Sequence, residues 1–241
     1  QVSMCLIVFA WKLLPSSPLI MAANRDEFYD RPSKAASWWD DCPDIYAGRD
    51  LQEGGTWLGI NRQGRFAALT NIRDGRQRRS DLRSRGALVA GYLGSEQPAE
   101  DYLHQVQETA DQYNGFNLLI GDGENIFWFS NQTKSGAAQL PPGIYGLSNG
   151  SLDDPWPKVV RAKAQFASLL CQSAPDDAYF EMLSDTTRAA DSRLPDTGVS
   201  LEWERLLSPI CIESPDYGTR ASTILKVHGA GSAELQERVI R

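Results

Sequence analysis

Histidine is scarce in this chain of 241 residues, which contains only His104 and His228. A multi-histidine metal centre or a Ser-His-Asp triad therefore has very few residues to draw on. Cysteine is also rare, and no C-x-x-C pair occurs among the four, which are Cys5, Cys42, Cys171 and Cys211. That spacing argues against a zinc site and against a small disulfide scaffold. We therefore expect no resident metal and no required cofactor.

Long hydrophobic runs are missing as well. The longest apolar stretches, such as 5–11 and 19–23, are far shorter than the roughly 20 residues that span a bilayer, and the first lacks the basic leader of a signal peptide. Lys and Arg number 24 against 31 Asp and Glu, a net charge of -7 that opposes non-specific binding to nucleic acid or anionic membrane. We expect a cytoplasmic protein that does not span a membrane.

The bulk composition is that of a globular protein, with 41% hydrophobic and 23% charged residues. A chain of this kind can bury a sizeable core, and chains of this length often form a single unit. We expect one domain over residues 1–241. Gln1, Val2 and Ser3 precede Met4. Because a natural reading frame begins with Met, we interpret these three residues as an extension or a remnant.

The order of predicted elements indicates the fold class. A hairpin is expected from strands at 5–11 and 19–24. The other predicted strands are 67–71, 116–121, 125–129 and 221–227, and 234–240 is either strand or helix. The predicted helices are 86–93, 98–112, 157–171 and 176–184, followed by a surface loop at 185–198. Strands at both ends with helices between them do not suit a doubly wound parallel sheet. They predict an α+β fold of antiparallel sheets covered by helices.

Cys5 stands at the start of the first predicted strand, directly after Met4. If the residues before it are removed, its thiol and its own α-amine belong to one residue. An α-amine has a pKa near ~8 and can act as the base for the thiol, so nucleophile and base need no histidine. The alternative is that Cys5 is a small apolar residue of the core.

Four polar residues end the second predicted strand, and they are Asn24, Arg25, Asp26 and Glu27. With the hairpin turn centred at 15–16, Cys5 lies opposite Asp26, within about two residues. Opposed residues of an antiparallel pair point to the same face, so we expect Asp26 and Asn24 on the Cys5 side. Arg25 would then point the other way, unless the strand bulges or ends there. Asp26 would then hold the amine in place, and an amide could donate to a developing oxyanion.

Further candidates lie at turns and at the ends of strands. Trp57, in the glycine-rich run 54–59, either walls a pocket or fills the core. Asn71 and Asn149 each close an apolar stretch, where they either present an amide or form a turn. Six arginines crowd the segment 73–85, either on a solvated loop or as a grip on carboxylates and phosphates, and they are Arg73, Arg76, Arg78, Arg79, Arg83 and Arg85.

These motifs, taken together and in order, resemble the NRDE family, which includes the transport and Golgi organisation proteins. The matching segments run from residue 4 to about 227, and they are Met4-Cys5, 24–27, Arg31-Pro32, 48–50, 54–59, 69–71, 146–149, 155–158 and 218–223. The resemblance implies a four-layer αββα sandwich related to the N-terminal-nucleophile hydrolases. It also implies roles in intracellular haem trafficking and in lipid or acyl-coenzyme A homeostasis.

A more distant likeness to choloylglycine hydrolases implies roles for single residues. Cys5 resembles their nucleophile, Asn71 and Asn149 their oxyanion-side amides, and Arg220 their late-strand arginine. Their early Arg and Asp are two residues apart, whereas Arg25 and Asp26 are adjacent here. This departure leaves the roles of Arg25 and Asp26 open.

Two functions from different classes follow. The first is a carrier that binds haem or an acyl-coenzyme A-like lipid in a pocket at Cys5. The residues expected to bind such a ligand are Asn24, Glu27, Arg49, Trp57, Arg73 and Arg76. With so few histidines, iron ligation would have to come from a few His, Met or Cys residues, so a transient haem contact is expected rather than a permanent site.

The second function is a hydrolase of amides or thioesters. Cys5 attacks a carbonyl, its amine moves the proton, Asp26 orients the amine, and Asn71 and Asn149 hold the oxyanion. A third class, an interaction scaffold, is supported only by the seven tryptophans. The sequence does not determine the oligomeric state.

Overall fold

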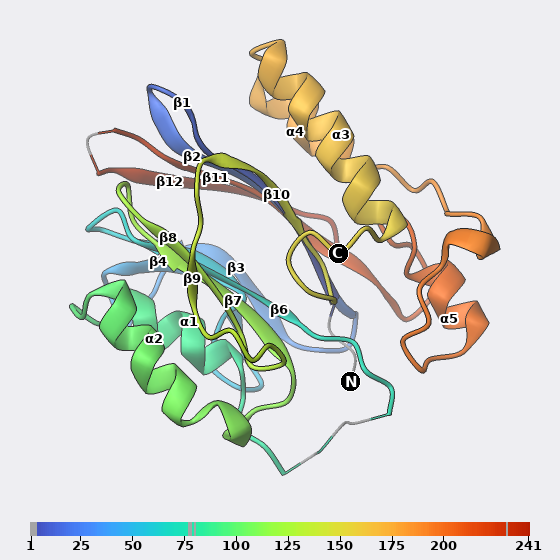
Figure 1. Cartoon of the computed structure of the whole chain (residues 1–241), viewed down its shortest axis with the longest axis horizontal. Helices are drawn as coiled ribbons and strands as arrows, with labels where there is room; N and C mark the ends of the chain where they lie inside the picture. The colour runs from blue at the N-terminus through green and yellow to red at the C-terminus, as the bar shows by residue number, and fades with distance from the viewer. Residues whose placement is uncertain (1–3, 77–78, 80, 230) are drawn as a thin grey trace.

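The computed structural model describes residues 4–76, 79, 81–229 and 231–241, and it has four layers (Figure 1). Two antiparallel β-sheets lie face to face in the middle, and helices cover the outer face of each sheet. The predicted α+β fold, a four-layer αββα sandwich of antiparallel sheets, is confirmed. No helix in the described ranges is both long and apolar enough to cross a bilayer.

The first sheet pairs strands from both ends of the chain. In spatial order its five strands are β10 (Gly143–Leu147), β1 (Met4–Leu14), β2 (Ser17–Phe28), β11 (Tyr217–Val227) and β12 (Ala233–Val239). The second sheet has seven strands in chain order, namely β3 (Ser33–Trp38), β4 (Ile45–Asp50), β5 (Leu58–Asn61), β6 (Phe66–Asn71), β7 (Phe116–Gly121), β8 (Ile126–Ser130) and β9 (Ala138–Gln139). The central position of β2 in the first sheet places its polar end inside the molecule.

Helices α1 (Gly86–Leu93) and α2 (Ala99–Glu108) cover the seven-stranded sheet, and α3 (Pro157–Cys171) and α4 (Asp176–Leu183) cover the five-stranded sheet. The short helix α5 (Leu201–Leu206) lies beyond the ends of the strands, on the side where both termini lie (Figure 1). Two 3-10 turns, Ala110–Gln112 and Asp191–Arg193, complete the described elements.

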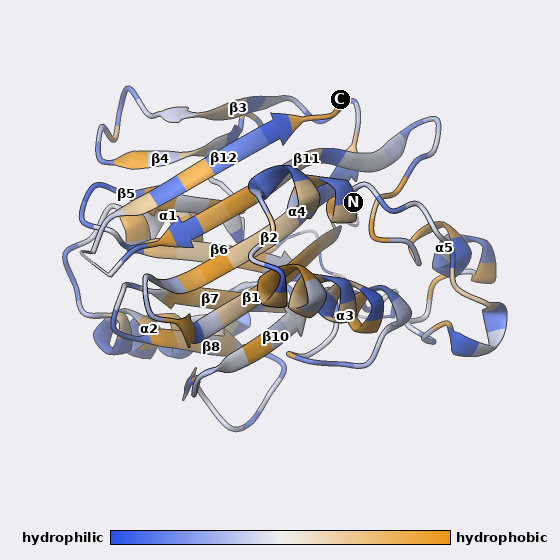
Figure 2. Ribbon diagram, turned by 90° about the horizontal axis from the view of Figure 1, so that it is seen from above, coloured by the Kyte–Doolittle hydropathy of each residue, from blue (hydrophilic) through white to orange (hydrophobic). Residues whose placement is uncertain are grey.

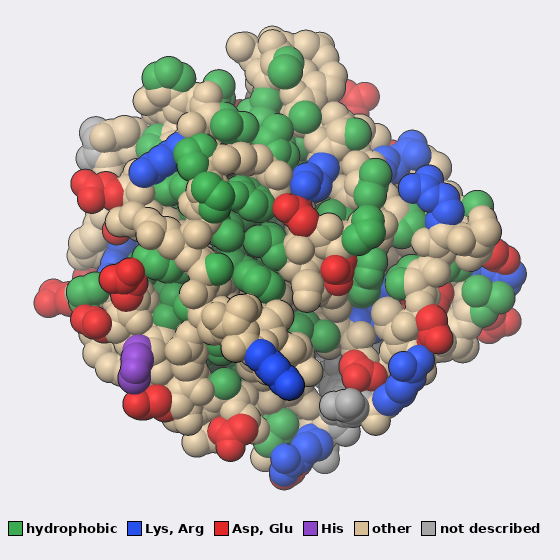
Figure 3. Space-filling model, viewed as in Figure 1, with side chains coloured by type: hydrophobic (Ala, Val, Ile, Leu, Met, Phe, Trp, Pro, Cys, Tyr) green, Lys and Arg blue, Asp and Glu red, His purple; other side chains and the backbone are tan. Residues whose placement is uncertain are grey.

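Alternate residues of β1 and β2 supply two different cores. Phe9, Trp11 and Met21 pack between the sheets, whereas Val8 and Ala22 pack under α3 and α4. This follows from the two-residue period of a strand whose faces are both covered. In Figure 2 the central strands are accordingly richer in hydrophobic residues than the edge strand β12. Figure 3 shows hydrophobic side chains gathered in the middle of one face, with charged side chains mainly around them.

Most of the predicted elements are present. The helix predicted at 98–112 ends earlier, at Glu108, and continues as the 3-10 turn. The ambiguous segment 234–240 is largely strand β12. The predicted elements do not include β3, β4, β5, β9, β10 or α5, which are short and lack a clear apolar period.

The predicted register of the first hairpin is wrong by one residue. The turn lies where expected, because Leu14 pairs with Ser17. A β-bulge then shifts the pairing between Leu14 and Trp11, at Lys12, whose φ of 50° lies in the left-handed region. As a result Cys5 lies opposite Arg25 rather than opposite Asp26. A shift of one residue exchanges the two faces of a strand.

Candidate functional site

The polar end of β2 therefore divides between two faces. Arg25 and Glu27 line a cavity at the end of the sandwich. Asn24 and Asp26 have their polar partners on the other face, among residues of the helix layer and β11. The expectation that Asp26 and Asn24 share the Cys5 face is wrong, and Arg25 takes that place.

Cys5 is buried, with 6% of its surface exposed. It lines a small pocket of about 10 Å³ together with Ile7, Ala23, Leu58 and Arg25. Burial, and next the charge of Asp26, raise the pKa of the Cys5 thiol to about 12. The thiol is therefore protonated and unreactive near neutral pH while its burial lasts.

Arg25 is held by stacking. Its guanidinium carbon lies 4.1 Å from the ring centroid of Trp57, and its Nη1 donates to Ser33 Oγ at 3.4 Å. The indole also packs directly on Gly48, where an added Cβ would lie 2.5 Å from the ring. Gly48 is thus required by close packing, and Trp57 contacts both this glycine and Arg25.

The cavity beside Arg25 has a volume of about 320 Å³ and is lined by many charged side chains. Three acids line it, and they are Glu27, Asp50 and Glu53. Five arginines line it, and they are Arg25, Arg31, Arg79, Arg83 and Arg85. The formal charge of these groups is positive, in a chain whose net charge is -7. Guanidinium groups at this density favour carboxylates and phosphates.

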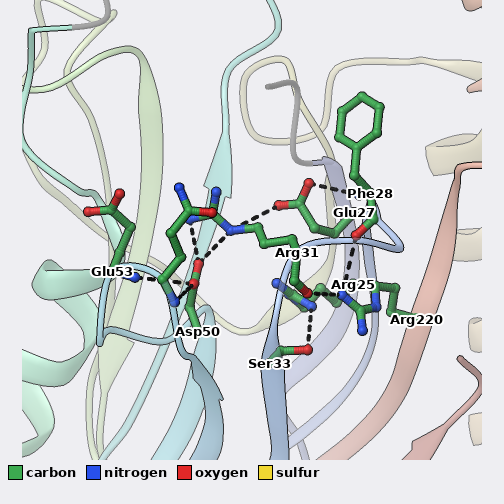
Figure 4. A network of polar contacts seen from close by, with 9 residues as sticks. Arg25, Glu27, Phe28, Arg31, Ser33, Asp50, Glu53 and Arg220 are labelled. Carbon is green, nitrogen blue, oxygen red and sulfur yellow. Dashed lines mark hydrogen bonds and ion pairs between the residues drawn. The ribbon is translucent and has the colours of Figure 1, made fainter.

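One arginine of the cavity is fully engaged by acids (Figure 4). Arg31 Nη2 lies 2.6 Å from Asp50 Oδ2, and its Nε lies 3.7 Å from Glu27 Oε2. Asp50 also accepts from the backbone N–H groups of Gln52 and Glu53. This cluster fixes one wall of the cavity, and it pairs two of the three acids, Glu27 and Asp50, with Arg31.

The opposite wall comes from the arginine-rich segment and α1. Arg79 pairs with Asp81 at 2.7 Å, and Arg83 Nη1 donates to Gln112 Oε1 at 3.1 Å. Arg85 Nη1 donates to the carbonyl of Gly115. Helix α1 begins next to these arginines with no acidic residue in its first turn, so its N-terminal dipole adds to the positive potential.

On the helix-facing side, Asn24 is satisfied by three buried partners. Its Nδ2 donates to the carbonyls of Leu183 and Ile210 at 2.8 and 2.9 Å, and its Oδ1 accepts from Ser222 Oγ at 2.6 Å. These bonds tie the end of α4 and the segment around 210 to the sheet. Asn24 is thereby a structural link and does not line the cavity.

Asp26 is fully buried beside a buried lysine. Thr219 Oγ1 donates to its Oδ1 at 2.6 Å, and Lys158 Nζ, from the first turn of α3, lies 3.8 Å from its Oδ2. Burial raises the pKa of Asp26 to about 6, and Lys158 and Thr219 oppose this rise. Burial lowers the pKa of Lys158. Neither Lys158 nor Thr219 was singled out from the sequence, although both lie within recognised motifs.

The two predicted oxyanion amides lie near Cys5 in different settings. Asn71 lines the cavity. Asn149 is buried, and its Nδ2 donates to the backbone carbonyl of Asn71 at 2.6 Å. The neighbouring Ser148 Oγ donates to the carbonyl of Cys5 at 3.0 Å. The segment around Asn149 thus anchors both the start of β1 and the end of β6.

Four predicted arginines bind elsewhere. Arg73 is buried in an ion pair with Glu204 of α5 at 3.0 Å, and Arg76 pairs at the surface with Asp196. The other two, Arg49 and Arg220, are also engaged: Arg49 forms a double hydrogen bond with Asp41, and Arg220 donates to the carbonyls of Phe28 and Arg31 (Figure 4). None of the four lines the cavity. Arg78 lies outside the described residues.

Comparison with known proteins agrees with this architecture. A mouse protein named Transport and Golgi organization 2 homolog is 37% identical, covering 98% of this chain and 92% of its own. The Drosophila melanogaster protein Transport and Golgi organization protein 2 is 29% identical over the same shares. Among solved structures, a mutant of conjugated bile acid hydrolase from Clostridium perfringens shares the fold, with a TM-score of 0.50 at 8% identity over 98% of this chain and 92% of that one.

The family model described as Transport and Golgi organisation 2 matches residues 4–241. That range contains both faces of β2, the cavity and every element of the two sheets. The chain therefore belongs to the Transport and Golgi organisation 2 family and has a fold of the N-terminal-nucleophile hydrolase type.

Proposed function

We propose that this protein is a carrier for a small molecule that bears carboxylate or phosphate groups, with haem and acyl-coenzyme A as candidate ligands. The observation that carries the proposal is the cavity of about 320 Å³ with its five arginines. Its volume is at the lower end of the range of small-molecule sites. The names of the relatives, which refer to transport, are in keeping with a carrier.

The charges of the cavity support an anionic ligand. Arg31 is neutralised by Asp50 and Glu27. The described side-chain contacts of Arg83 are with neutral groups, the amide of Gln112 and the ring of Tyr113. A guanidinium of this kind can exchange its hydrogen bond to a neutral amide for an ion pair with a carboxylate or phosphate, whose geometry its fork matches. The arginine-rich segment is thus suited to grip an acidic group.

Haem would be held through its propionates. The residues that line the cavity in the described part of the chain include arginines for carboxylates and no His, Cys or Met for iron. Cys5 lies behind Arg25 and Trp57, with its pKa raised to about 12 by burial. Propionate binding with weak iron contact fits a protein that takes up and releases its cargo.

Titration calorimetry with haemin and with dodecanoyl-coenzyme A tests the proposal. Arg83→Gln should weaken the binding of the preferred ligand by about ten-fold, because one charge-assisted hydrogen bond is lost. The matched control is Arg205→Gln, which removes an exposed arginine paired with Asp191 at a distant site. If neither probe binds the wild-type chain, or if both variants bind equally, the proposal fails.

A second candidate function is hydrolysis of an amide or thioester by Cys5. It is supported by the position of Cys5 at the start of β1 and by its pocket, which shares Arg25 with the cavity. In that reaction the thiol attacks the carbonyl, the α-amine takes up the thiol proton and passes it to the leaving group, and water then releases the acyl group. While Met4 is attached, the nitrogen of Cys5 is an amide and cannot act as the base.

N-terminal sequencing of the protein purified from its native cell tests this second function. Hydrolysis requires a chain that begins at Cys5, together with activity on acyl amides or thioesters that Cys5→Ala removes. A native chain with residues intact before Cys5, and no turnover, would leave the carrier as the function.

A further inference from the structure

Two spaces meet at a common wall. The cavity of about 320 Å³ and the small pocket at Cys5 are both lined by Arg25, Trp57 and Leu69. On the cavity side the remaining walls are mainly charged or polar. The pocket is also lined by Asn24 and Thr223, but its Ile7, Ala23 and Leu58 continue into the core between the sheets. A positively charged environment for an acidic head and a largely apolar one for a tail are therefore separated by one layer of side chains.

Stacking holds this wall in place. Arg25 lies over the ring of Trp57, and Trp57 rests on the bare backbone of Gly48. A cation–π contact is a weak interaction and Trp57 is only partly buried against the core, so a change of side-chain rotamer can open such a wall. The pocket behind it holds only about 10 Å³, close to the space of one water molecule. No ligand chain fits there until Trp57 moves.

We propose that the Arg25–Trp57 stack is a movable wall, and that the ligand class is an amphipathic anion with one narrow apolar chain. The acidic head binds the arginines of the cavity, and the chain passes the displaced indole towards Cys5. This inference rests on the proposed function, since it adds a tail site to the head site. It makes Trp57 the residue that determines the length and width of the chain.

The chemistry of the two walls favours a narrow chain over a broad planar ring system. Ile7, Ala23 and Leu58 stand on neighbouring strands of two sheets that already pack on each other. Separating the sheets to admit a broad ring would break close packing over a large area. A single alkyl chain needs only the volume that Trp57 leaves, and each methylene that it buries adds to the affinity.

The rate at which iodoacetamide alkylates Cys5 tests the wall. Peptide mass spectrometry follows Cys5, with the other buried thiol, Cys211, as an internal reference in the same sample. Trp57→Ala should raise the Cys5 rate by about ten-fold or more, because water and reagent reach the thiol, and leave Cys211 unchanged. Trp38→Ala, at an exposed edge-strand tryptophan, is the matched control and should change neither rate. An unchanged Cys5 rate, or an equal rise at Cys211, overturns the proposal.

Arg25→Met is the second variant, because it removes the stacked cation while keeping a long side chain. It should also raise the rate at which iodoacetamide alkylates Cys5. Dodecanoate should slow Cys5 alkylation in the wild-type chain at concentrations where acetate, a head without a tail, has no effect. Equal protection by both would overturn the tail site. The alkylation rates of Cys5 in the ligand-free variants test the movable wall, whereas ligand binding by Arg83→Gln tests the proposed carrier function. One proposal can therefore fail while the other holds.

Discussion

The two faces of strand β2 carry the same kinds of side chain in opposite circumstances. On the helix side, Asn24 and Asp26 find all their described partners within the protein. On the cavity side, Arg25 and Glu27 border open space and other charged groups. Alternate residues of the polar run 24–27 thus have different roles. The helix side holds the layers together, and the cavity side is where a ligand can act.

The helix side should dominate stability, and Asn24→Ala gives the largest expected effect. The substitution leaves two buried carbonyls and the hydroxyl of Ser222 without their amide partner. We expect a loss of about 3 kcal/mol in the free energy of unfolding, measured by urea denaturation followed by tryptophan fluorescence. Arg25→Met, on the cavity side, should cost about 1 kcal/mol or less. Equal costs would remove the distinction between the two faces.

Asp26, on the helix side of β2, should make the free energy of unfolding depend on pH. Its pKa is raised from an ordinary value of 3.8 to about 6, so the folded chain keeps a proton that the unfolded chain releases between these values. Its contribution to stability is therefore present below pH 4 and is lost as the pH rises to 6. The stability of the wild type relative to Asp26→Asn should fall by roughly 2 kcal/mol across this window.

Calorimetric or urea unfolding of both proteins at several pH values measures that difference directly. An Asn at position 26 keeps the Oδ1 that accepts the hydrogen bond from Thr219, so the comparison isolates the effect of ionising Asp26. A difference that stays constant would show that Lys158 and Thr219 balance the effect of burial, and one that grows with pH would show that they outweigh it; either result contradicts a raised pKa.

The smallest expected effect has the opposite sign and lies on the cavity side. Glu27→Gln removes a negative charge from the cavity wall and keeps the acceptor for the backbone N–H of Phe28. We expect an acidic ligand to bind only about three-fold more tightly, because the nearby Arg31 already offsets much of the negative charge of Glu27. Glu181→Gln, at an exposed position of α4, should leave the affinity unchanged. Weaker binding by Glu27→Gln would place the acid among the groups that hold the ligand.

Local sequence patterns predicted much of the fold and part of the site. The apolar runs located the two long strands, and the helical period of Val159, Ala162 and Phe166 located α3. The turn at 15–16 was also correct. The bulge at Lys12 could not be predicted, because a lysine with positive φ carries no sequence signal, and it reversed the faces of Arg25 and Asp26.

The arginine-rich segment shows the same limit. Its composition left a solvated loop and a grip on anions as alternatives, and which arginines line the cavity depends on acids that are distant in the sequence. Arg73 forms a buried ion pair with Glu204, and Arg76 forms an ion pair with Asp196 at the surface. The arginines left for the cavity are the later ones, Arg79, Arg83 and Arg85, together with Arg25 and Arg31 from the other wall.

Hydrogen–deuterium exchange with and without bound probe tests the central claim most directly, because it reports on both faces of β2 at once. With dodecanoyl-coenzyme A or haemin, we expect slower exchange in residues 50–57 and 81–86 around the cavity, and unchanged exchange in α3 and in residues 183–212. Protection confined to the helix side, or no protection by either probe, would contradict the assignment of the cavity as the ligand site.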